Sequence, residues 1–373
     1  MFDFIKNKNF HASLDKFTGC LLGGAIGDAI GFPIEFWGIG RIIESFGTCG
    51  IDHLLLDRYS RTACISDDTQ MTIFTADGLL WADQQQSKDY SRYVFLSYQR
   101  WYYMQTGFSA DIQYMQQIKN GYDNEILKIR GLGAPRSPGR TCMFSLETSK
   151  NYHYGTINEP INNSKGCGGV MRVAPAGLYY YDSPEIAFRM AADFAAITHG
   201  HPCGYLSAGA FGFIVAQIIG GMNIRSAVIA SLKDLNKYQG HEECTALLKK
   251  ALKLSKSNVK PYEAVISLGD GWVAEETLAI AVYCALKYPH DIKKAICLAV
   301  NHGGDSDSTG AVCGNILGAY LGRKGVPQQW IEQVESSDFI SMIAQKLYFS
   351  VQKQYQKPMG LTAENAGIGE KTV

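Results

Sequence analysis

Two short segments near opposite ends of the chain place carboxylates next to hydroxyl groups. They are Ser66-Asp67-Asp68-Thr69 and Asp305-Ser306-Asp307-Ser308. Oxygen ligands of these types suit hard cations such as Mg²⁺ or Mn²⁺. If the fold brings the two segments together, they can form a two-metal site that orients a substrate and activates water. The pair therefore indicates a hydrolase, whereas neither segment alone would.

Each segment also has an alternative interpretation. Ser66 is a favoured N-cap, and Asp67 and Asp68 suit the first turn of a helix, where the macrodipole is positive. Seen alone, helix capping is the simpler explanation of the first segment. The second segment matches the opening of an EF-hand loop, but the twelfth position is Ile316, where a bidentate Glu is required. An EF-hand is therefore excluded.

Three further strings carry groups that could serve a reaction. Glu35 is surrounded by apolar residues, so it is either a buried partner of a base or a catalytic group with a shifted pKa. The string from Lys165 through Gly166-Cys167-Gly168-Gly169 to Arg172 offers backbone amides near two basic residues. Such a string suits a phosphate, although a tight packing turn fits equally well. His199-Gly200-His201-Pro202-Cys203 lacks a second ligand pair, so a zinc site is not indicated.

The elements that must position these residues are helical. Apolar residues recur at helical spacing over 68–81, 184–196, 204–219, 227–235, 275–286 and 310–321. Because strand-like alternation is scarce, we predict about a dozen helices packed in layers. The segment from Gly19 to Gly31 carries small residues at helical spacing, which lets another helix approach closely.

A single domain is the simplest organisation, because a boundary between the two acidic segments would separate the proposed ligands. We therefore predict a single all-α domain of many helices over residues 17–353. Residues 1–16 are expected to form an N-terminal extension, and residues 354–373 a C-terminal tail.

The composition excludes several classes of protein. Apolar residues make up 46% of the chain and charged residues 19%, so a large core is possible. The 35 basic and 35 acidic residues cancel, which argues against sequence-specific nucleic-acid binding. The ten cysteines are scattered singly, as in a reducing compartment, and Met1–Lys16 lacks a signal core. The apolar stretch over 208–222 is too short and glycine-rich for a membrane span, so we expect a cytoplasmic protein.

Six strings, taken in order, resemble the ADP-ribosylglycohydrolase family over most of the chain, from about Phe17 to about Leu321. They are Gly23-Gly24-Ala25-Ile26-Gly27-Asp28-Ala29, Ser66-Asp67-Asp68-Thr69, Gly166-Cys167-Gly168-Gly169-Val170-Met171-Arg172, Thr198-His199, Gly271-Trp272-Val273-Ala274-Glu275 and Gly303-Gly304-Asp305-Ser306-Asp307-Ser308.

The resemblance implies a single compact, orthogonal, all-α multi-helix domain with a central dinuclear metal cleft, which holds two Mg²⁺ or Mn²⁺ ions at its base. It also implies a set of metal ligands: Ser66, Asp67, Asp68, Asp305, Asp307 and Ser308. Ser66 and Ser308 stand where the family often has Thr, which keeps the hydroxyl.

Roles in the reaction follow from the same resemblance. Glu35 corresponds to an acid near the scissile bond, the segment 166–169 to the residues around the diphosphate, and His199 to the ribose side. Together with Glu35, Asp67 and Asp307 are expected to be catalytic. The implied reaction cleaves the C1 ribosyl bond of a modified protein side chain, commonly arginine, and releases ADP-ribose.

Three alternatives remain at the level of sequence. The chain could be an immunity protein that occludes an ADP-ribosyltransferase toxin through Phe2, Phe4, Ile5 and Phe10, in addition to or instead of hydrolysis. Deletion of residues 1–13 would separate the two activities. A metal-free glycosidase with two carboxylates is disfavoured by the clustered hydroxyl and acid ligands. A non-catalytic relative is disfavoured because the acids are retained.

Overall fold

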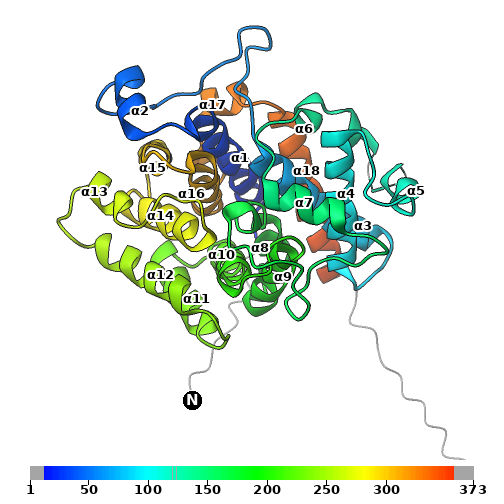
Figure 1. Ribbon diagram of the computed structural model, residues 1–373. Helices are drawn as coiled ribbons and strands as arrows, with labels where there is room; N and C mark the ends of the chain where they lie inside the picture. The colour runs from blue at the N-terminus through cyan, green and yellow to red at the C-terminus, as the bar shows by residue number, and fades with distance from the viewer. Residues whose placement is uncertain (1–11, 120, 123, 357–373) are drawn as a thin grey trace, which may run out of the picture.

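The computed structural model describes residues 12–119, 121–122 and 124–356. Within these ranges the chain forms α-helices and short 3₁₀-helices in one body, with isolated β-bridges in place of strands (Figure 1). The prediction of a single all-α domain is confirmed. The helices are α1 Leu14–Gly31, η1 Phe32–Ile34, α2 Ile39–Phe46, α3 Asp67–Gln84, α4 Tyr90–Thr106, α5 Tyr114–Lys119, η2 Asn124–Lys128, α6 Arg130–Gly133, α7 Arg140–Thr148, η3 Cys167–Gly169, α8 Ala174–Tyr179, α9 Pro184–Ala196, α10 Pro202–Ile219, α11 Ile224–Leu235, α12 Glu242–Leu254, α13 Pro261–Ile266, α14 Ala274–Lys287, α15 Ile292–Val300, α16 Ser306–Leu321, η4 Arg323–Gly325, α17 Gln328–Gln333 and α18 Ser337–Gln356.

The six predicted helical ranges correspond to α3, α9, α10, α11, α14 and α16. Helix α16 begins at Ser306 instead of Gly310, because Asp305 caps it by accepting a hydrogen bond from the backbone N–H of Ser308. The helices α2, α4, α7, α12, α15 and α18 lie outside the predicted ranges. So do α5, α6, α8, α13 and α17, which have four to six residues each and are too short to show a full helical period.

Helices α1 and α16 pack against each other in antiparallel orientation at the centre of the molecule (Figure 1). Their contact is a glycine seam made of Gly19, Gly23 and Gly27 on α1 and Gly318, Gly314 and Gly310 on α16. A Cβ atom added at Gly27 would lie 2.0 Å from the carbonyl oxygen of Gly310. Only glycine allows backbones to approach this closely, so the predicted close approach of a second helix to this segment is confirmed.

The glycine seam sets the position of one side of the cavity described below. At its end, Gly31 lies against Ser306, where an added Cβ would come within 2.3 Å of the Ser306 carbonyl oxygen. The chain then turns through η1, and Glu35 follows directly. The seam therefore brings Glu35 beside the first turn of α16, which carries the second acidic segment.

Among the residues that the structure describes, two helical segments are long and apolar enough to cross a membrane. They are Leu14–Ile34, which combines α1 and η1, and α10. In each, 89% of the most apolar window is buried inside the protein. This burial is typical of core helices, and the helix neighbours of α10 include α8, α9, α11 and α14.

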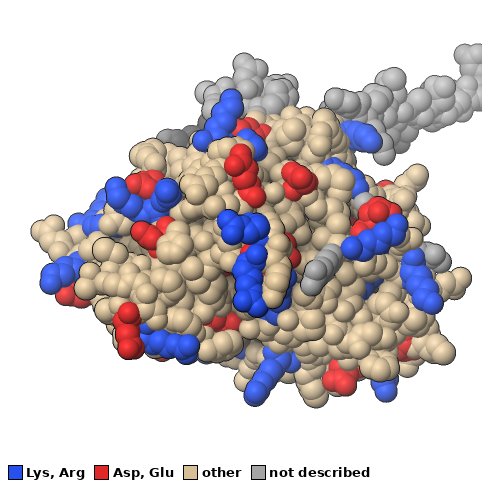
Figure 2. Space-filling view, turned by 90° about the horizontal axis from the view of Figure 1, so that it is seen from above, with Lys and Arg blue, Asp and Glu red and all other residues tan. Residues whose placement is uncertain are grey.

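The predicted flanks lie partly inside the described region. Helix α1 already begins at Leu14, and α18 continues to Gln356. The proposed toxin-binding residues Phe2, Phe4, Ile5 and Phe10 lie outside the described residues, as does the tail from residue 357 onward. On the face seen in Figure 2, acidic and basic side chains are spread in small groups of both signs.

Candidate functional site

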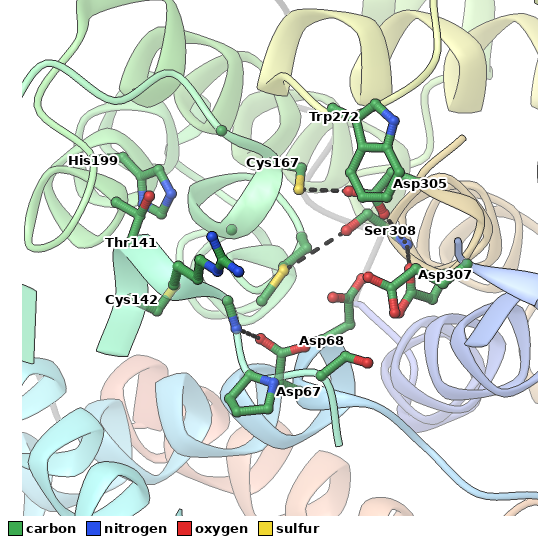
Figure 3. Close-up of a pocket in the computed structure, with 18 of the residues that line it drawn as sticks. Asp67, Asp68, Thr141, Cys142, Cys167, His199, Trp272, Asp305, Asp307 and Ser308 are labelled. Atoms are coloured by element: carbon green, nitrogen blue, oxygen red, sulfur yellow. Dashed lines mark hydrogen bonds between the residues drawn. The ribbon is translucent and has the colours of Figure 1, made fainter. Parts of the chain in front are cut away.

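A cavity of about 560 Å³ opens where the first turns of α3 and α16 meet the loops before α7, α10 and α14. In Figure 3, Asp67 and Asp68 approach this space from α3, and Asp305, Asp307 and Ser308 approach it from the start of α16. The predicted site residues that line the cavity are Glu35, Asp67, Asp68, Gly166, Cys167, Gly168, His199, Asp305, Asp307 and Ser308. Two predicted site residues, Ser66 and Gly169, are not part of its lining. The two acidic segments, distant in sequence, therefore share one cavity.

The backbone of the first acidic segment is held by a buried acid, Asp28. Ser66 is the N-cap of α3, and its hydroxyl accepts a hydrogen bond of 3.2 Å from the backbone N–H of Asp68. The carboxylate of Asp28, on α1, accepts hydrogen bonds from the backbone N–H groups of Ser66 at 3.0 Å and Thr69 at 3.1 Å. Helix capping is thus correct for Ser66, and Asp28 fixes the turn that carries Asp67 and Asp68.

Replacing Asp28 with Asn should reduce activity, although Asp28 itself does not line the cavity. The Asn side chain keeps one oxygen but presents an NH₂ group to backbone N–H donors, so the turn loses a charge-assisted partner worth about 2 kcal/mol. We expect turnover to fall by roughly 10–100-fold, the usual cost of removing a group that orients metal ligands. Divalent-cation affinity, measured by calorimetry, should fall with it.

Asp234→Asn is the matched control for this experiment. Asp234 is also buried, but it lies on α11, does not line the cavity and pairs with Lys237. If Asp28→Asn binds cations and turns over substrate as the control does, the positioning role of Asp28 is wrong.

The second acidic segment forms the first turn of α16. Asp305 and Asp307 each accept a hydrogen bond from the backbone N–H of Ser308, at 3.2 and 3.1 Å. The thiol of Cys167 donates to the other oxygen of Asp305 at 2.7 Å. Like the first segment, this one lies at a helix N-terminus, where the macrodipole favours negative charge.

The acids of the cavity are crowded and lack countercharges. Burial raises the pKa of Asp67 to about 8. It also raises that of Glu35 to about 8, with Asp305 as the next cause. The pKa values of Asp68, Asp305 and Asp307 are raised as well, first of all by burial. Among the described residues, none of these five acids forms an ion pair with Lys, Arg or His.

This donor set fits divalent cations. Asp68 Oδ2 and Glu35 Oε2 are buried without a hydrogen-bond partner, which is costly for a carboxylate unless a cation compensates. Carboxylate and hydroxyl oxygens are the ligands that Mg²⁺ and Mn²⁺ prefer. The residues present therefore fit the predicted metals, and the assignment of individual ligands stays a prediction.

The glycine-rich string also lines the cavity, beside the second acidic segment, where Cys167 contacts Asp305. An added Cβ at Gly168 would lie 2.9 Å from both Cys142 Sγ and His199 Cε1, so the string packs tightly there. The amides of Gly166 and Cys167 are already hydrogen-bonded, to Ser164 Oγ and to the carbonyl of Trp272. The role of this wall in binding a diphosphate stays a prediction.

The two basic residues of this string do not line the cavity, contrary to the expectation that they lie near a phosphate. Arg172 is fully buried. Lys165 binds Glu275 at 2.6 Å and also Glu243. The basic side chain in the cavity lining is instead that of Arg140, at the start of α7.

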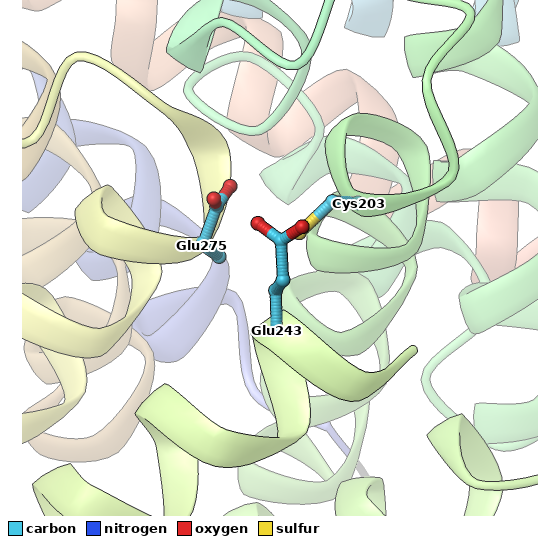
Figure 4. Close-up of side chains that lie close together, drawn as sticks. All are labelled: Cys203, Glu243 and Glu275. Carbon is cyan, nitrogen blue, oxygen red and sulfur yellow. The ribbon is translucent and has the colours of Figure 1, made fainter. Parts of the chain in front are cut away.

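Glu243 and Glu275 also belong to a second cluster of metal-binding residue types. Their carboxylates and the thiol of Cys203 lie within 4.8 Å of one another and point together in Figure 4. The ammonium group of Lys165 binds both carboxylates. Because this cation already compensates the charge, the cluster is an ion-pair network that fixes the glycine-rich string to α12 and α14.

Several cavity residues were not predicted as site residues. The loop of Ser137, Pro138 and Gly139 and the first turn of α7 form one wall, and the Gly139 N–H donates to Asp67 at 3.0 Å. At the rim, the rings of Phe36 and Trp272 stack with centroids 5.6 Å apart and planes at 17°. Their side chains are 70% and 40% exposed. Trp272 belonged to a family-like string, but no pattern in the sequence singled out the loop.

Comparisons with known proteins agree on one family. A sequence model of the ADP-ribosylglycohydrolase family matches residues 10–357. Mouse (Mus musculus) ADP-ribosylhydrolase ARH3 is 26% identical, over 90% of this chain and 92% of its own. ADP-ribosyl-[dinitrogen reductase] glycohydrolase of Rhodospirillum rubrum is 24% identical, over 86% and 90%. ADP-ribosylarginine hydrolase Tri1 of Serratia proteamaculans is 24% identical, over 90% and 80%.

The fold also matches a solved structure. An ADP-ribosylglycohydrolase-related protein complex superposes with a TM-score of 0.59 at 21% identity, and the match covers 91% of this chain and 98% of that one. At this identity the likeness concerns the fold alone.

Proposed function

The chain belongs to the ADP-ribosylglycohydrolase family, and from this premise we propose that it is a metal-dependent hydrolase that removes ADP-ribose from modified protein side chains. The observation that carries the proposal is the single cavity shared by Glu35 and both acidic segments. The names of the three relatives describe enzymes that act on ADP-ribosyl groups. The name of the Serratia relative specifies arginine, and that of the Rhodospirillum relative specifies dinitrogen reductase.

Two Mg²⁺ or Mn²⁺ ions held by the predicted ligands would supply Lewis-acid chemistry, fixing the ribose hydroxyls and making a water molecule more acidic. The residues of the chain complete the site. Cleavage at C1 builds positive charge on the ribose, which the buried acids favour electrostatically. Glu35 lines the cavity together with both acidic segments, so its carboxylate, when ionised, can take a proton from the attacking water.

We propose arginine as the modified side chain. The rim of the cavity supports this choice, because Phe36 directly follows Glu35 and stacks on Trp272 with both rings partly exposed. A guanidinium is a planar cation that stacks on aromatic faces, whereas the hydroxyl oxygen of a serine acceptor gains nothing from them. The rim thus provides a surface for the leaving arginine next to the acid.

A linkage panel tests the proposed function. Proteins or peptides with arginine-, serine- and nucleobase-linked ADP-ribose are incubated with the enzyme, with Mg²⁺ or with EDTA, and free ADP-ribose is measured. We expect release from the arginine-linked substrate, and only when Mg²⁺ is present. Full release in EDTA would contradict the metal requirement, and cleavage of the serine-linked substrate alone would contradict the choice of arginine.

Removing either ring of the rim should weaken binding of the arginine-linked substrate. For Phe36→Ala and Trp272→Ala we expect KM to rise about tenfold, the upper range for one cation–π contact, with a smaller change in kcat. Affinity for free ADP-ribose should stay unchanged. The backbone carbonyl of Trp272, which accepts from Cys167, is retained in the variant.

Phe108→Ala serves as the control, since Phe108 is 75% exposed and does not line the cavity. An equal loss of affinity for free ADP-ribose would show that the rim binds the nucleotide instead of the acceptor.

A further inference from the structure

His199 reaches the cavity from the turn that follows α9, and it is almost completely buried, with 2% of its surface exposed. Its Nδ1 atom lies 2.8 Å from the hydroxyl oxygen of Thr198. Its Nε2 atom faces the glycine-rich wall, 3.4 Å from where a Cβ of Gly166 would be and 3.2 Å from that of Gly168. One nitrogen of the ring thus points into the protein and the other toward the cavity.

Behind Thr198 lies the buried guanidinium of Arg172. Its Nη2 atom donates to the Thr198 hydroxyl oxygen at 2.7 Å and to the carbonyl of Phe194 at 3.1 Å. The guanidinium also lies over the ring of Tyr98, 4.3 Å from the centroid. Both Arg172 and Thr198 are fully buried, so this arrangement is shielded from solvent.

The chemistry of these groups determines where the protons lie. A guanidinium can only donate, so the Thr198 oxygen accepts from Arg172 and its own hydrogen is free for another acceptor. The Nδ1 atom of His199 lies 2.8 Å away, and we assign it as the acceptor of this hydrogen. The opposite tautomer would require Thr198 to accept twice and to donate to the thiol of Cys142, which is a weak acceptor. The hydrogen of the imidazole therefore lies on Nε2.

The ring is also uncharged. Burial, and next the positive charge of Arg172, lower the pKa of His199 to about 3. A doubly protonated ring would in any case have no lone pair on Nδ1 to accept from Thr198. The geometry and the charge of the neighbouring guanidinium favour the same form of the ring.

We propose that Arg172, acting through Thr198, holds His199 as a neutral imidazole whose Nε2–H group donates a hydrogen bond to an oxygen of the bound ADP-ribose. This inference rests on the proposed function. It assigns Arg172 and Thr198 as positioning residues, since neither lines the cavity. Glycine at position 168 leaves room for the ring, because a Cβ there would lie only 2.9 Å from Cε1 and 3.2 Å from Nε2. A fixed neutral donor recognises the ADP-ribose part of the substrate, whichever protein side chain carries the ADP-ribose.

The test compares Thr198→Val with Thr198→Ser. The Val variant keeps the shape but removes the hydroxyl, so Nδ1 loses its donor and the ring is free to take the other tautomer. We expect the Kd for free ADP-ribose, measured by calorimetry, to rise about tenfold in Thr198→Val, with KM for the modified protein rising in parallel and kcat nearly unchanged. Thr198→Ser keeps the hydroxyl and should restore wild-type affinity.

Thr245→Val is the matched control. Thr245 also bonds a histidine, with its hydroxyl 2.9 Å from His241 Nδ1, but this pair lies at α12 and does not line the cavity. The same substitution there should leave the Kd for ADP-ribose unchanged.

A direct readout comes from NMR of the wild-type protein with ¹⁵N-labelled histidine. The His199 signal is assigned by its loss in His199→Gln. Its nitrogen shifts should show a protonated Nε2 and an unprotonated Nδ1, and in Thr198→Val the ring should become a mixture of tautomers. A protonated Nδ1 in the wild type would overturn the inference, as would equal ADP-ribose affinity in the Val and Ser variants.

These results are separable from failure of the proposed function. If the wild-type protein released ADP-ribose from none of the panel substrates, the proposed activity would be wrong. The tautomer spectrum and the affinity for free ADP-ribose would still decide the role of Arg172 and Thr198.

Discussion

Asp307→Asn should abolish release of ADP-ribose, with a loss of more than about 100-fold in turnover, because even groups that only orient a metal ligand cost up to that much. Asp307 lies in the first turn of α16, lines the cavity and is 2% exposed. The substitution keeps its size and removes its charge, so the packing of the turn should survive. Release of ADP-ribose from an arginine-linked substrate is the measurement, with and without EDTA.

The loss must be distinguished from simple unfolding. The circular dichroism spectrum of metal-free Asp307→Asn should match that of the wild type. Its melting temperature should be equal or higher, since a crowded buried carboxylate has been removed. The Asp234→Asn control should keep wild-type activity. Substantial activity in Asp307→Asn, or undiminished activity of the wild type in EDTA, would contradict the metal-dependent mechanism.

The second large effect is on stability. Without divalent cations, the protein should become less stable as pH rises from about 4 to about 8, and Mg²⁺ or Mn²⁺ should remove most of this loss. Asp67 and Glu35 have folded-state pKa values of about 8, well above the ordinary values of 3.8 and 4.5. The folded state therefore holds protons that the unfolded state has released.

The sign follows from this difference in bound protons. The contribution of these groups is fully present below pH 4 and is lost as pH rises toward 8. Each unit of pKa difference corresponds to about 1.4 kcal/mol, so the loss of stability is large enough to measure by thermal unfolding. Because the loss is electrostatic, bound cations at saturating concentration should reverse it and raise the melting temperature by several degrees.

Thermal melts from pH 4 to pH 8, with and without cation, measure this effect. In Asp67→Asn the decline with pH should be smaller and the cation-induced rise in melting temperature should disappear, whereas Asp234→Asn should behave as the wild type. An identical pH dependence in the wild type and Asp67→Asn would show that the cavity acids do not carry the effect.

The sequence predicted some of the helices and the meeting of the two acidic segments because both leave local patterns in the order of residues, whereas long helices such as α4 and α18 were missed. The small residues from Gly19 to Gly31 implied a closely packed partner helix, and the seam with α16 confirms it. The acids at 66–68 and 305–307 stand at helix starts, where their hydrogen bonds are local. Such features follow from the order of residue types alone.

The sequence predicted less well where partners come from elsewhere in the chain. Lys165 directly precedes the glycine-rich string in the sequence, but its side chain forms ion pairs with Glu243 on α12 and Glu275 on α14. The side chain of Arg172 is buried and donates a hydrogen bond to the hydroxyl of Thr198. The loop at 137–139 forms a wall because Gly139 bonds Asp67, a contact that no local pattern encodes. For these residues only the tertiary structure shows where the side chain is directed.

The glycine seam has a consequence for biosynthesis. Its two halves, Gly19 to Gly27 on α1 and Gly310 to Gly318 on α16, lie far apart in the sequence. During translation, α1 is made long before its partner, so the acids of the cavity cannot assemble until α16 has emerged. Contacts this distant in sequence are also slow to form, because a loop of nearly the whole chain must close. The cavity can therefore form only after α16 has been synthesised and has packed against α1.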